Sequence, residues 1–130
     1  LYAQCFPPAD GIFQRIVRGK ALGVQVKITG MHPASAANRQ LLALAISECV
    51  TNCVRHAGGT ELYVRLRNIG NTLDVTITNN GAVPEGTIRE GGGLSGLRRR
   101  VSAAGGRMTV YSHPRFALVV MLPDKEENAP

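Results

Sequence analysis

The fold is decided by residues 36–78, which read AANRQLLALAISECVTNCVRHA, then GG, then TELYVRLRNIGNTLDVTIT. In residues 36–56, small and apolar side chains recur at helical spacing, so this stretch predicts one long helix that ends at the glycine pair. Residues 61–67 and 72–78 alternate apolar and polar side chains on either side of an Asn-Ile-Gly-Asn turn, which predicts a β-hairpin. A helix followed by a hairpin indicates an α/β domain, because their apolar faces can cover each other.

The flanking sequence adds further elements of both kinds. They are, in chain order, a short helix at 8–20, a strand at 24–28, a loop at 30–35, a long loop at 79–93, a helix at 94–104, and a second hairpin with strands at 108–112 and 117–122. With so many hairpins, we expect the sheet to be mixed. We therefore predict an α/β fold, a two-layer sandwich in which a mixed sheet of about five strands is covered on one face by about three helices.

Length and composition indicate the domain organisation. The chain has 130 residues, of which 44% are hydrophobic and 18% charged, and this suits one folded domain. We expect a single domain at 1–123 and a polar C-terminal tail at 124–130, and the opening Leu1 indicates a piece of a longer protein. Three cysteines are too few and too sparse for a disulfide scaffold, which favours a reducing cytoplasm.

The charge of the chain points to anionic partners. The net charge is +6, and 12 of the 15 basic residues are arginine, which is well suited to binding phosphate groups. Aromatic residues are few, and no basic stretch alternates with them as it does in proteins that bind single-stranded nucleic acid. We therefore expect a bound phosphate ligand and no nucleic acid.

A polar stripe borders the apolar face of the long helix. Glu48, Asn52 and His56 follow one another at intervals of four, so they stack on one side of the helix, with Arg55 beside them. An ordinary solvated helix face is the alternative interpretation. A zinc site formed by His56 and the two cysteines of this helix is less favoured than a pair of core cysteines, because three ligands on one helix rarely close a tetrahedral site.

A glycine-rich segment precedes the last helix, at residues 91–97, which read GGGLSGL. Glycines before a helix let backbone N–H groups approach a phosphate, and the helix dipole adds partial positive charge there. A flexible connector is the alternative, and the segment matches neither the dinucleotide-binding fingerprint nor the P-loop. The phosphate interpretation gains weight if this segment meets the polar stripe in space.

Together these motifs resemble those of the GHKL ATPase superfamily. Residues 48–57, ECVTNCVRHA, resemble its N-box, residues 91–101, GGGLSGLRRRV, resemble its G2 box, and residues 79–81, NNG, stand in the place of its G1 box. Over residues 41–123 the chain is most similar to the catalytic ATP-binding domains of bacterial sensor histidine kinases, within them to the nitrate-sensor and lipid-fluidity-sensor group. The resemblance implies the Bergerat fold, which agrees with the predicted element order.

The resemblance also implies roles for individual residues. Asn52 matches the asparagine that coordinates Mg²⁺, and its amide oxygen is a hard ligand suited to that ion. Glu48 matches the acidic residue that polarises the acceptor or orients water. The implied catalytic residues are thus Glu48 and Asn52, and the residues implied to bind nucleotide are Asn52, Arg55, His56, Asn79, Gly81, Gly91, Gly93, Leu94 and Gly96.

The sequence departs from the family pattern around the adenine site. The family's G1 box is DxGxG, and its Asp accepts a hydrogen bond from the adenine amino group, whereas here Asn79 stands in that position and no second glycine follows Gly81. Phe116-Ala117 replaces a Gly-Thr pair, and the lid at 84–92 is short and lacks an aromatic residue. A neutral amide can accept or donate but lacks the charge-assisted bond, so we expect weaker discrimination between ATP and GTP than in the relatives.

The activity that the resemblance implies is that of a histidine kinase catalytic domain. It would bind ATP and Mg²⁺ and transfer the γ-phosphoryl group to a histidine on a separate dimerisation domain, acting indirectly on a response regulator. The full protein would be a homodimer, either cytoplasmic or the cytoplasmic part of a membrane-anchored sensor, while the isolated domain can be monomeric. None of His32, His56 and His113 lies in an N-terminal helix with an acidic neighbour, as the acceptor would.

Two alternatives to this activity stay open. One is an anti-sigma-factor-type serine kinase, which shares these motifs. The other is a degenerate nucleotide-binding module without catalysis, which the altered G1 box alone supports. A helix pair with a phosphoacceptor histidine upstream would favour the histidine kinase over the serine kinase. Titration with ATP in the presence and absence of Mg²⁺ would distinguish a catalytic domain from the degenerate module.

Overall fold

The computed structural model describes residues 22–86, 88 and 91–125, so the helix predicted at 8–20 lies outside the described residues. In chain order the elements are β1 (Gln25–Thr29), α2 (Ala36–Asn52), the π-helical turn η3 (Cys53–Ala57), β2 (Glu61–Ile69), β3 (Thr72–Asn79), α3 (Gly92–Ala103), β4 (Arg107–Tyr111) and β5 (Ala117–Pro123). Within this described part, no helix combines the length and the apolar character needed to cross a bilayer.

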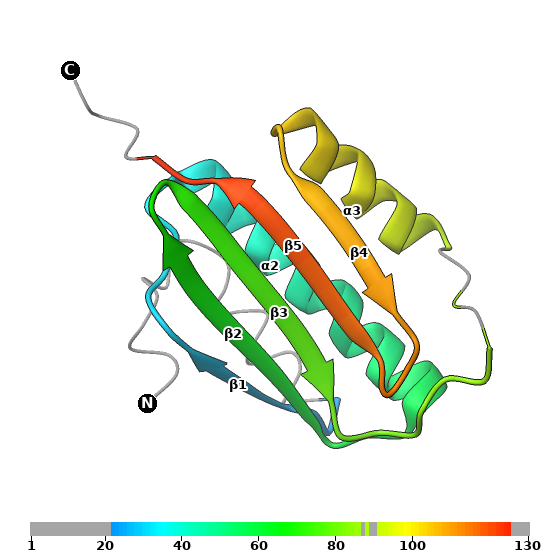
Figure 1. The fold of residues 1–130 in the computed structure, drawn as a ribbon. Coiled ribbons are helices and arrows are strands. Elements are labelled where there is room, and N and C mark those ends of the chain that lie inside the picture. Colours follow the sequence, from blue (N-terminus) through cyan, green and yellow to red (C-terminus); the bar gives the residue numbers. More distant parts are fainter. Residues whose placement is uncertain (1–21, 87, 89–90, 126–130) are drawn as a thin grey trace.

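The five strands form one mixed sheet in the order β1-β2-β3-β5-β4. β1 pairs with β2 in parallel, and the other three pairings are antiparallel. Helices α2 and α3 lie together on one face of this sheet (Figure 1). The predicted two-layer α/β fold with a mixed sheet is confirmed, with two of the three expected helices among the described residues.

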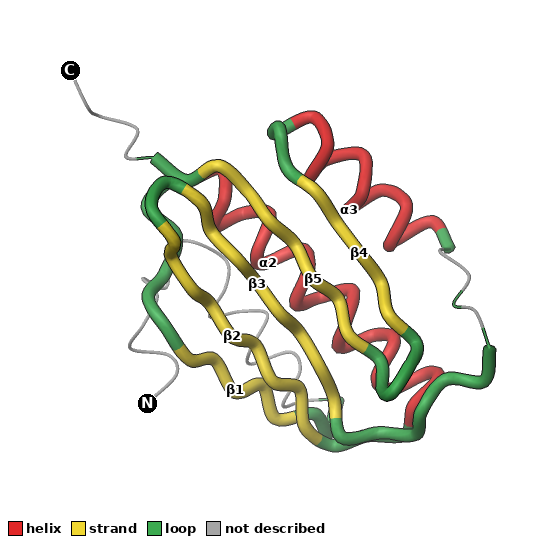
Figure 2. Tube along the Cα trace, viewed as in Figure 1, coloured by secondary structure: helices red, strands yellow, loops and turns green. Residues whose placement is uncertain are grey.

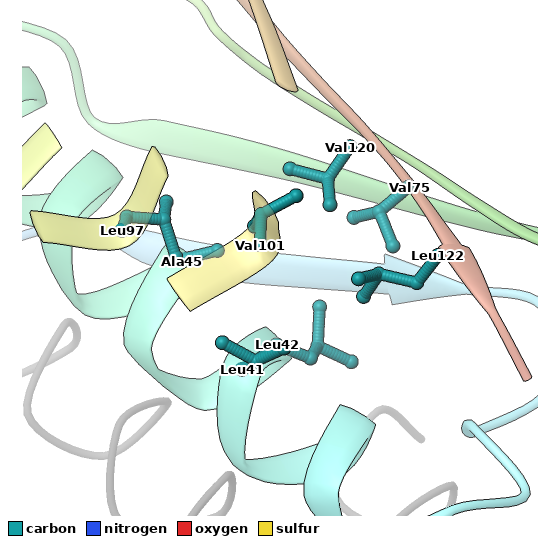
Figure 3. A pocket seen from close by; sticks show the side chains of 8 residues that line it. All are labelled: Leu41, Leu42, Ala45, Val75, Leu97, Val101, Val120 and Leu122. Atoms are coloured by element: carbon teal, nitrogen blue, oxygen red, sulfur yellow. The ribbon is translucent and has the colours of Figure 1, made fainter. Parts of the chain in front are cut away.

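The core lies between the two helices and the sheet. The apolar stripe predicted for the long helix is buried, at Leu42, Ala45, Ile46, Cys49, Val50 and Cys53. Where α2, α3 and the sheet meet, apolar side chains from all three surround a gap of about 10 Å³ (Figure 3), which is no larger than a single water needs. The interface between α2, α3 and the sheet is therefore closely packed, and the gap in it has no room for a ligand.

The long helix does not keep α-helical geometry to its predicted end at residue 56. Its α-helical part stops at Asn52, and the chain continues through the wider turn of η3 to Gly58, which takes a left-handed φ of 62°. The Ala57 carbonyl accepts a hydrogen bond of 2.9 Å from the Ala82 N–H. The end of the helix is thus held against the loop that follows β3, and that loop leads on to the start of α3 (Figure 2).

The opposite end of α2 is fastened to the end of β5. The Asp124 carboxylate accepts hydrogen bonds from the N–H groups of Ala34 (2.9 Å) and Ser35 (3.2 Å) and from Asn38 Nδ2 (2.9 Å). Ser35 is the N-cap of the helix and accepts from the Asn38 N–H. Ordered contacts therefore reach one residue into the predicted tail at 124–130, while the domain division itself stays a prediction.

Candidate functional site

A pocket of about 690 Å³ opens at the C-terminal end of α2, a size typical of small-molecule sites. Its wall comes from four parts of the chain: α2 with η3, the end of β3 with the following loop, the start of α3, and the residue before β5. Eight predicted site residues line it: Glu48, Asn52, Arg55, His56, Asn79, Gly91, Gly93 and Leu94. The fold thus brings together the polar stripe and the glycine-rich segment.

Two predicted site residues, Gly81 and Gly96, do not line the pocket. Gly81 packs against Ala57, where an added Cβ would collide with the end of η3. Gly96 lies in α3, where an added Cβ would meet only the Arg99 guanidinium, at 3.7 Å. Their assignment to nucleotide binding stays a prediction that rests on the resemblance alone.

One end of the pocket suits an anion. Helix α3 begins with no side-chain cap on its first turn, so its first N–H groups are not used by a capping side chain. Added Cβ atoms at Gly91 and Gly92 would meet nothing within 4 Å, so an approaching ligand can reach the backbone there. Arg55 and His56 line the same pocket from η3. The helix N-terminus and the guanidinium together favour phosphate groups.

Glu48 connects α2 to α3 inside the pocket. Its carboxylate lies against Gly93 so closely that a Cβ at Gly93 would collide with it. A carboxylate at the first turn of a helix interacts favourably with the helix dipole. The glycine at position 93 therefore allows an acidic side chain of the polar stripe to reach the start of α3.

Glu48 and Asn52 are two pocket residues that could hold a divalent cation. They lie one turn apart in α2, both line the pocket, and each offers a hard oxygen atom. Across residues 22–86, 88 and 91–125, no group of three or more His, Cys, Asp and Glu side chains could hold a metal by itself. This combination suits Mg²⁺, which binds through one or two protein ligands together with phosphate oxygens and water.

The other end of the pocket contains a buried amide. Asn79 is 6% exposed, and its Oδ1 accepts a hydrogen bond of 2.8 Å from the Gly81 N–H. Thr78 pairs with Ala117, so Asn79 and the buried Phe116 lie at adjoining ends of β3 and β5. The neighbouring Asn80 has a structural role instead, since its Oδ1 accepts from two backbone N–H groups at the start of β2.

The two described cysteines belong to the core. Cys49 and Cys53 are fully buried in α2 and η3. Burial raises the pKa of both thiols, although a backbone hydrogen bond from Gly59 partly offsets the rise for Cys53. Both side chains therefore stay protonated and act as small apolar groups, as the core interpretation of this helix expects.

The sequence reasoning missed several residues that line the pocket, among them Thr51, Val83, Ile88 and Phe116. Thr51 could have been found, because it follows Glu48 by three positions and so shares its helix face. Phe116 belongs to the Phe116-Ala117 pair that stands in place of the Gly-Thr pair of the family pattern, and it lines the pocket. Val83 and Ile88 belong to a loop without periodicity, and no local signal pointed to them.

Comparisons with known proteins agree with this picture. A family model described as histidine kinase-, DNA gyrase B- and HSP90-like ATPase matches residues 37–126. Sensor histidine kinase DesK of Bacillus subtilis is 24% identical over 72% of this chain and 26% of that protein. The histidine-protein kinase/phosphatase UhpB of Salmonella typhimurium is 30% identical over 70% of this chain and 18% of its own length. The chain therefore spans about a quarter or less of these relatives.

Among solved structures, the ATP binding domain of PrrB from Mycobacterium tuberculosis superposes with a TM-score of 0.68. The match covers 93% of this chain and 96% of that domain, at 21% sequence identity. At this level of identity the likeness shows a shared fold.

Proposed function

The chain belongs to the family of histidine kinase-, DNA gyrase B- and HSP90-like ATPases, and from that premise we propose that it is the ATP-binding catalytic domain of a sensor histidine kinase. The observation that carries the proposal is that Glu48, Asn52 and the glycine-rich start of α3 line one pocket together. The relatives DesK and UhpB are named as histidine kinases, which supports the same activity. The bound nucleotide would be ATP.

The triphosphate would lie at the α3 end of the pocket. There the backbone N–H groups of the first helical turn, next to Gly91 and Gly93, donate to phosphate oxygens. Arg55, which lines the same pocket from η3, offsets their negative charge. Glu48 already lies against Gly93, so an incoming phosphate changes the position of this carboxylate or shares a cation with it.

The donor set of Glu48 and Asn52 supports a magnesium ion bound together with the triphosphate. When bound, this ion would neutralise charge on the phosphate oxygens as the γ-phosphoryl group is transferred. Asn52 would supply an amide oxygen as one ligand of the ion. Glu48 orients the acceptor or the water around the triphosphate, and its proximity to α3 keeps it close to the transferred group.

The phosphoryl acceptor would be a histidine on a separate dimerisation domain of the same kinase, which then passes the group to a response regulator. The described His32, His56 and His113 lie in a loop, in η3 and in the β4–β5 turn, and none of them suits this role. A homodimer and a cytoplasmic position for the catalytic domain belong to the same proposal.

A labelled-phosphoryl assay tests this function. The chain is incubated with ATP labelled at the γ-phosphate and with a histidine-bearing dimerisation domain of a sensor histidine kinase, in the presence of Mg²⁺ or of a chelator. We expect metal-dependent labelling that is lost in acid, as for a phosphoramidate. Acid-stable labelling of a serine supports the anti-sigma-factor-type alternative, and ATP binding without transfer to any acceptor supports a module without catalysis.

Glu48→Gln is the matching variant, since it keeps the shape of the side chain and removes its charge. We expect it to retain ATP binding and to lose most of the transfer. If Glu48→Gln transfers at the rate of the unchanged chain, the role of Glu48 is refuted, while the binding site stands.

A further inference from the structure

We propose that the open sheet face, the side of the sheet turned away from α2 and α3, docks an acidic segment of a partner protein. One cross-strand row defines this face: Arg65 on β2, Thr76 on β3, Val119 on β5 and Thr109 on β4, each paired with the next. None of these four residues lines the nucleotide pocket, so the inference goes beyond the proposed function.

The alternation along β2 puts two arginines on the open sheet face. Leu62, Val64 and Leu66 are buried in the core, and successive side chains of a strand point to opposite faces of the sheet. Arg65 and Arg67 therefore lie on the side that the helices leave open, and both are exposed.

A third arginine lies on the far side of the same face. Met108 of β4 is buried, so its neighbour Arg107 is directed outward, and Arg107 pairs with Met121 of β5. Because β3 and β5 separate β2 from β4, the backbones at Arg65 and Arg107 are roughly 14 Å apart across the strands, at about 4.8 Å per strand. An extended peptide covers that span in about four residues.

The acidic side chains of the sheet do not balance this positive charge. Glu61 and Asp74 are the acidic residues of the five strands. Each has a basic partner, since Lys27 Nζ lies 3.0 Å from the Glu61 carboxylate and Arg67 lies 3.0 Å from that of Asp74. Within residues 22–86, 88 and 91–125, the two flanking arginines on β2 and β4 form no ion pair. A partner that carries carboxylates would supply the complementary charge.

Other side chains of the open sheet face are of the kinds that protein interfaces favour. Tyr111 and Met121 are 49% and 42% exposed, and tyrosine, methionine and arginine are enriched at interfaces, where lysine and acidic residues are depleted. Arg115, in the turn between β4 and β5, acts on the same face. The hydrogen bond to Glu61 raises the pKa of the Tyr63 hydroxyl, and the charge of Arg115 is among those that oppose the rise.

The side chains between the flanking arginines favour a peptide over a membrane. Thr76 and Val119 are short and only partly exposed, so the long side chains of Arg65 and Arg107 stand on either side of a lower floor. An extended segment can lie on such a floor, where a threonine hydroxyl can bond to its backbone. A guanidinium binds a carboxylate with two parallel hydrogen bonds. The occupant is thus an extended segment with Asp or Glu at intervals of about four residues.

NMR titration of the isotope-labelled chain tests the proposal. The probe is a short peptide with glutamates four residues apart, and the reference is the same peptide with glutamine in their place. We expect the acidic peptide to bind about tenfold tighter or more, to weaken as salt screens the charges, and to shift the amide signals of β2, β3, β5 and β4. Equal binding of both peptides, or shifts confined to the pocket, overturns the proposal.

A pair of charge-reversal variants locates the contact. The double variant Arg65→Glu and Arg107→Glu should lose about tenfold or more in affinity for the acidic peptide. The control, Arg99→Glu with Arg100→Glu, makes the same change of charge at exposed positions of α3, in the helical layer. At physiological salt, where charges are screened over about 8 Å, it should lose less than about twofold. Equal losses in the two variants, both verified as folded by circular dichroism, overturn the assignment to the sheet.

Two further probes separate the partner classes. If vesicles that contain phosphatidylserine, or a single-stranded DNA, bind through Arg65 and Arg107 while the acidic peptide does not, the assignment to a protein partner is overturned. Titration with ATP keeps this question apart from the proposed function, because neither arginine lines the nucleotide pocket. Docking can therefore fail while ATP binding stands.

Discussion

Removal of the Asn52 side chain should affect metal-dependent nucleotide binding without affecting folding. The side chain makes no capping hydrogen bond at the start of η3, so truncation removes no cap from that turn. We expect Asn52→Ala to lower Mg²⁺-dependent ATP affinity by about tenfold or more and to change the free energy of unfolding by less than about 0.5 kcal/mol. Titration with and without Mg²⁺, beside urea unfolding, measures both. Undiminished metal-dependent affinity would contradict the N-box assignment.

Gly93 and Gly96 offer a matched pair of substitutions in one helix. A Cβ at position 93 displaces the flexible Glu48 carboxylate and covers the first turn of α3, whereas a Cβ at position 96 meets only the Arg99 guanidinium at 3.7 Å. We expect Gly93→Ala to fold and to lose several-fold in ATP affinity. Gly96→Ala should bind like the unchanged chain and gain about 0.5 kcal/mol of stability.

Equal losses of affinity in both variants would favour the role that the resemblance implies for Gly96. Equal retention in both would mean that the ligand does not approach the start of α3. Thermal melting of each variant shows that any loss comes from binding and not from unfolding.

The site residues differ in how far the sequence alone could place them. Glu48 and Asn52 were predictable, because helical spacing fixes which side chains share a face. The contact between Glu48 and Gly93 depends on how α2 and α3 pack, which no local pattern encodes. The bond from the Gly81 N–H to Asn79 depends on a turn whose conformation the shortened motif left open.

Among the elements, β1 is an edge strand that a cluster of side chains ties to β2. Lys27 Nζ lies 3.0 Å from the Glu61 carboxylate, which also accepts a hydrogen bond from the Tyr63 hydroxyl. The Tyr63 hydroxyl first, and Lys27 second, lower the pKa of Glu61. A lowered folded-state pKa gives stability that is present above the ordinary carboxyl value and is lost as pH falls through the folded value.

Glu61→Gln should therefore destabilise the chain at pH 7 and have less effect at an acidic pH below the folded-state pKa, where the native carboxyl is protonated too. The effect is small, because these side chains are partly exposed to solvent and salt. Urea unfolding of both chains at the two pH values measures it. A destabilisation that is the same at both pH values would show that the charge of Glu61 contributes nothing.

Asp124 connects the end of β5 to the start of α2 through its hydrogen bonds. Replacing it with Ala removes the acceptor for two backbone N–H groups and for the buried Asn38 amide. Since a buried donor that loses its partner costs about 1–3 kcal/mol, we expect Asp124→Ala to lower the free energy of unfolding by that amount. Lys125→Ala, one residue further and exposed, should change stability little. Chemical unfolding measures the free energy of unfolding of both variants. Equal values would show that Asp124 does not stabilise the contact between β5 and α2.

Element types were more predictable than their ends. The two hairpins follow from alternation around short turns, and the predicted strands 61–67 and 72–78 lie within the longer β2 and β3. The π-helical turn was not predictable, because η3 is held by a bond between Ala57 and Ala82, which lie far apart in the sequence. The same turn moves His56 out of the four-residue stacking expected for it, although it still lines the pocket.

At the scale of the whole molecule, packing and binding are separated along α2. Its apolar face meets α3 and the sheet around a gap of about 10 Å³, whereas its C-terminal end opens into a pocket of about 690 Å³. The walls of that pocket come from α2 with η3, the end of β3, the start of α3 and the residue before β5. Only the folded chain brings these segments together, so a ligand in the pocket binds the native state and not the unfolded one.

Nucleotide binding should therefore raise the thermal stability of the whole domain. A ligand that binds only the native state stabilises it by about 2.7 kcal/mol at a hundred times its dissociation constant. For a chain of 130 residues this corresponds to a rise in Tm of roughly 10 °C. We expect that rise with ATP and Mg²⁺ in a melting experiment followed by circular dichroism. A chelator should remove most of it, because the triphosphate then loses the cation that Glu48 and Asn52 would share with it. An equal rise in the chelator would show that the phosphates are held by α3 and Arg55 alone.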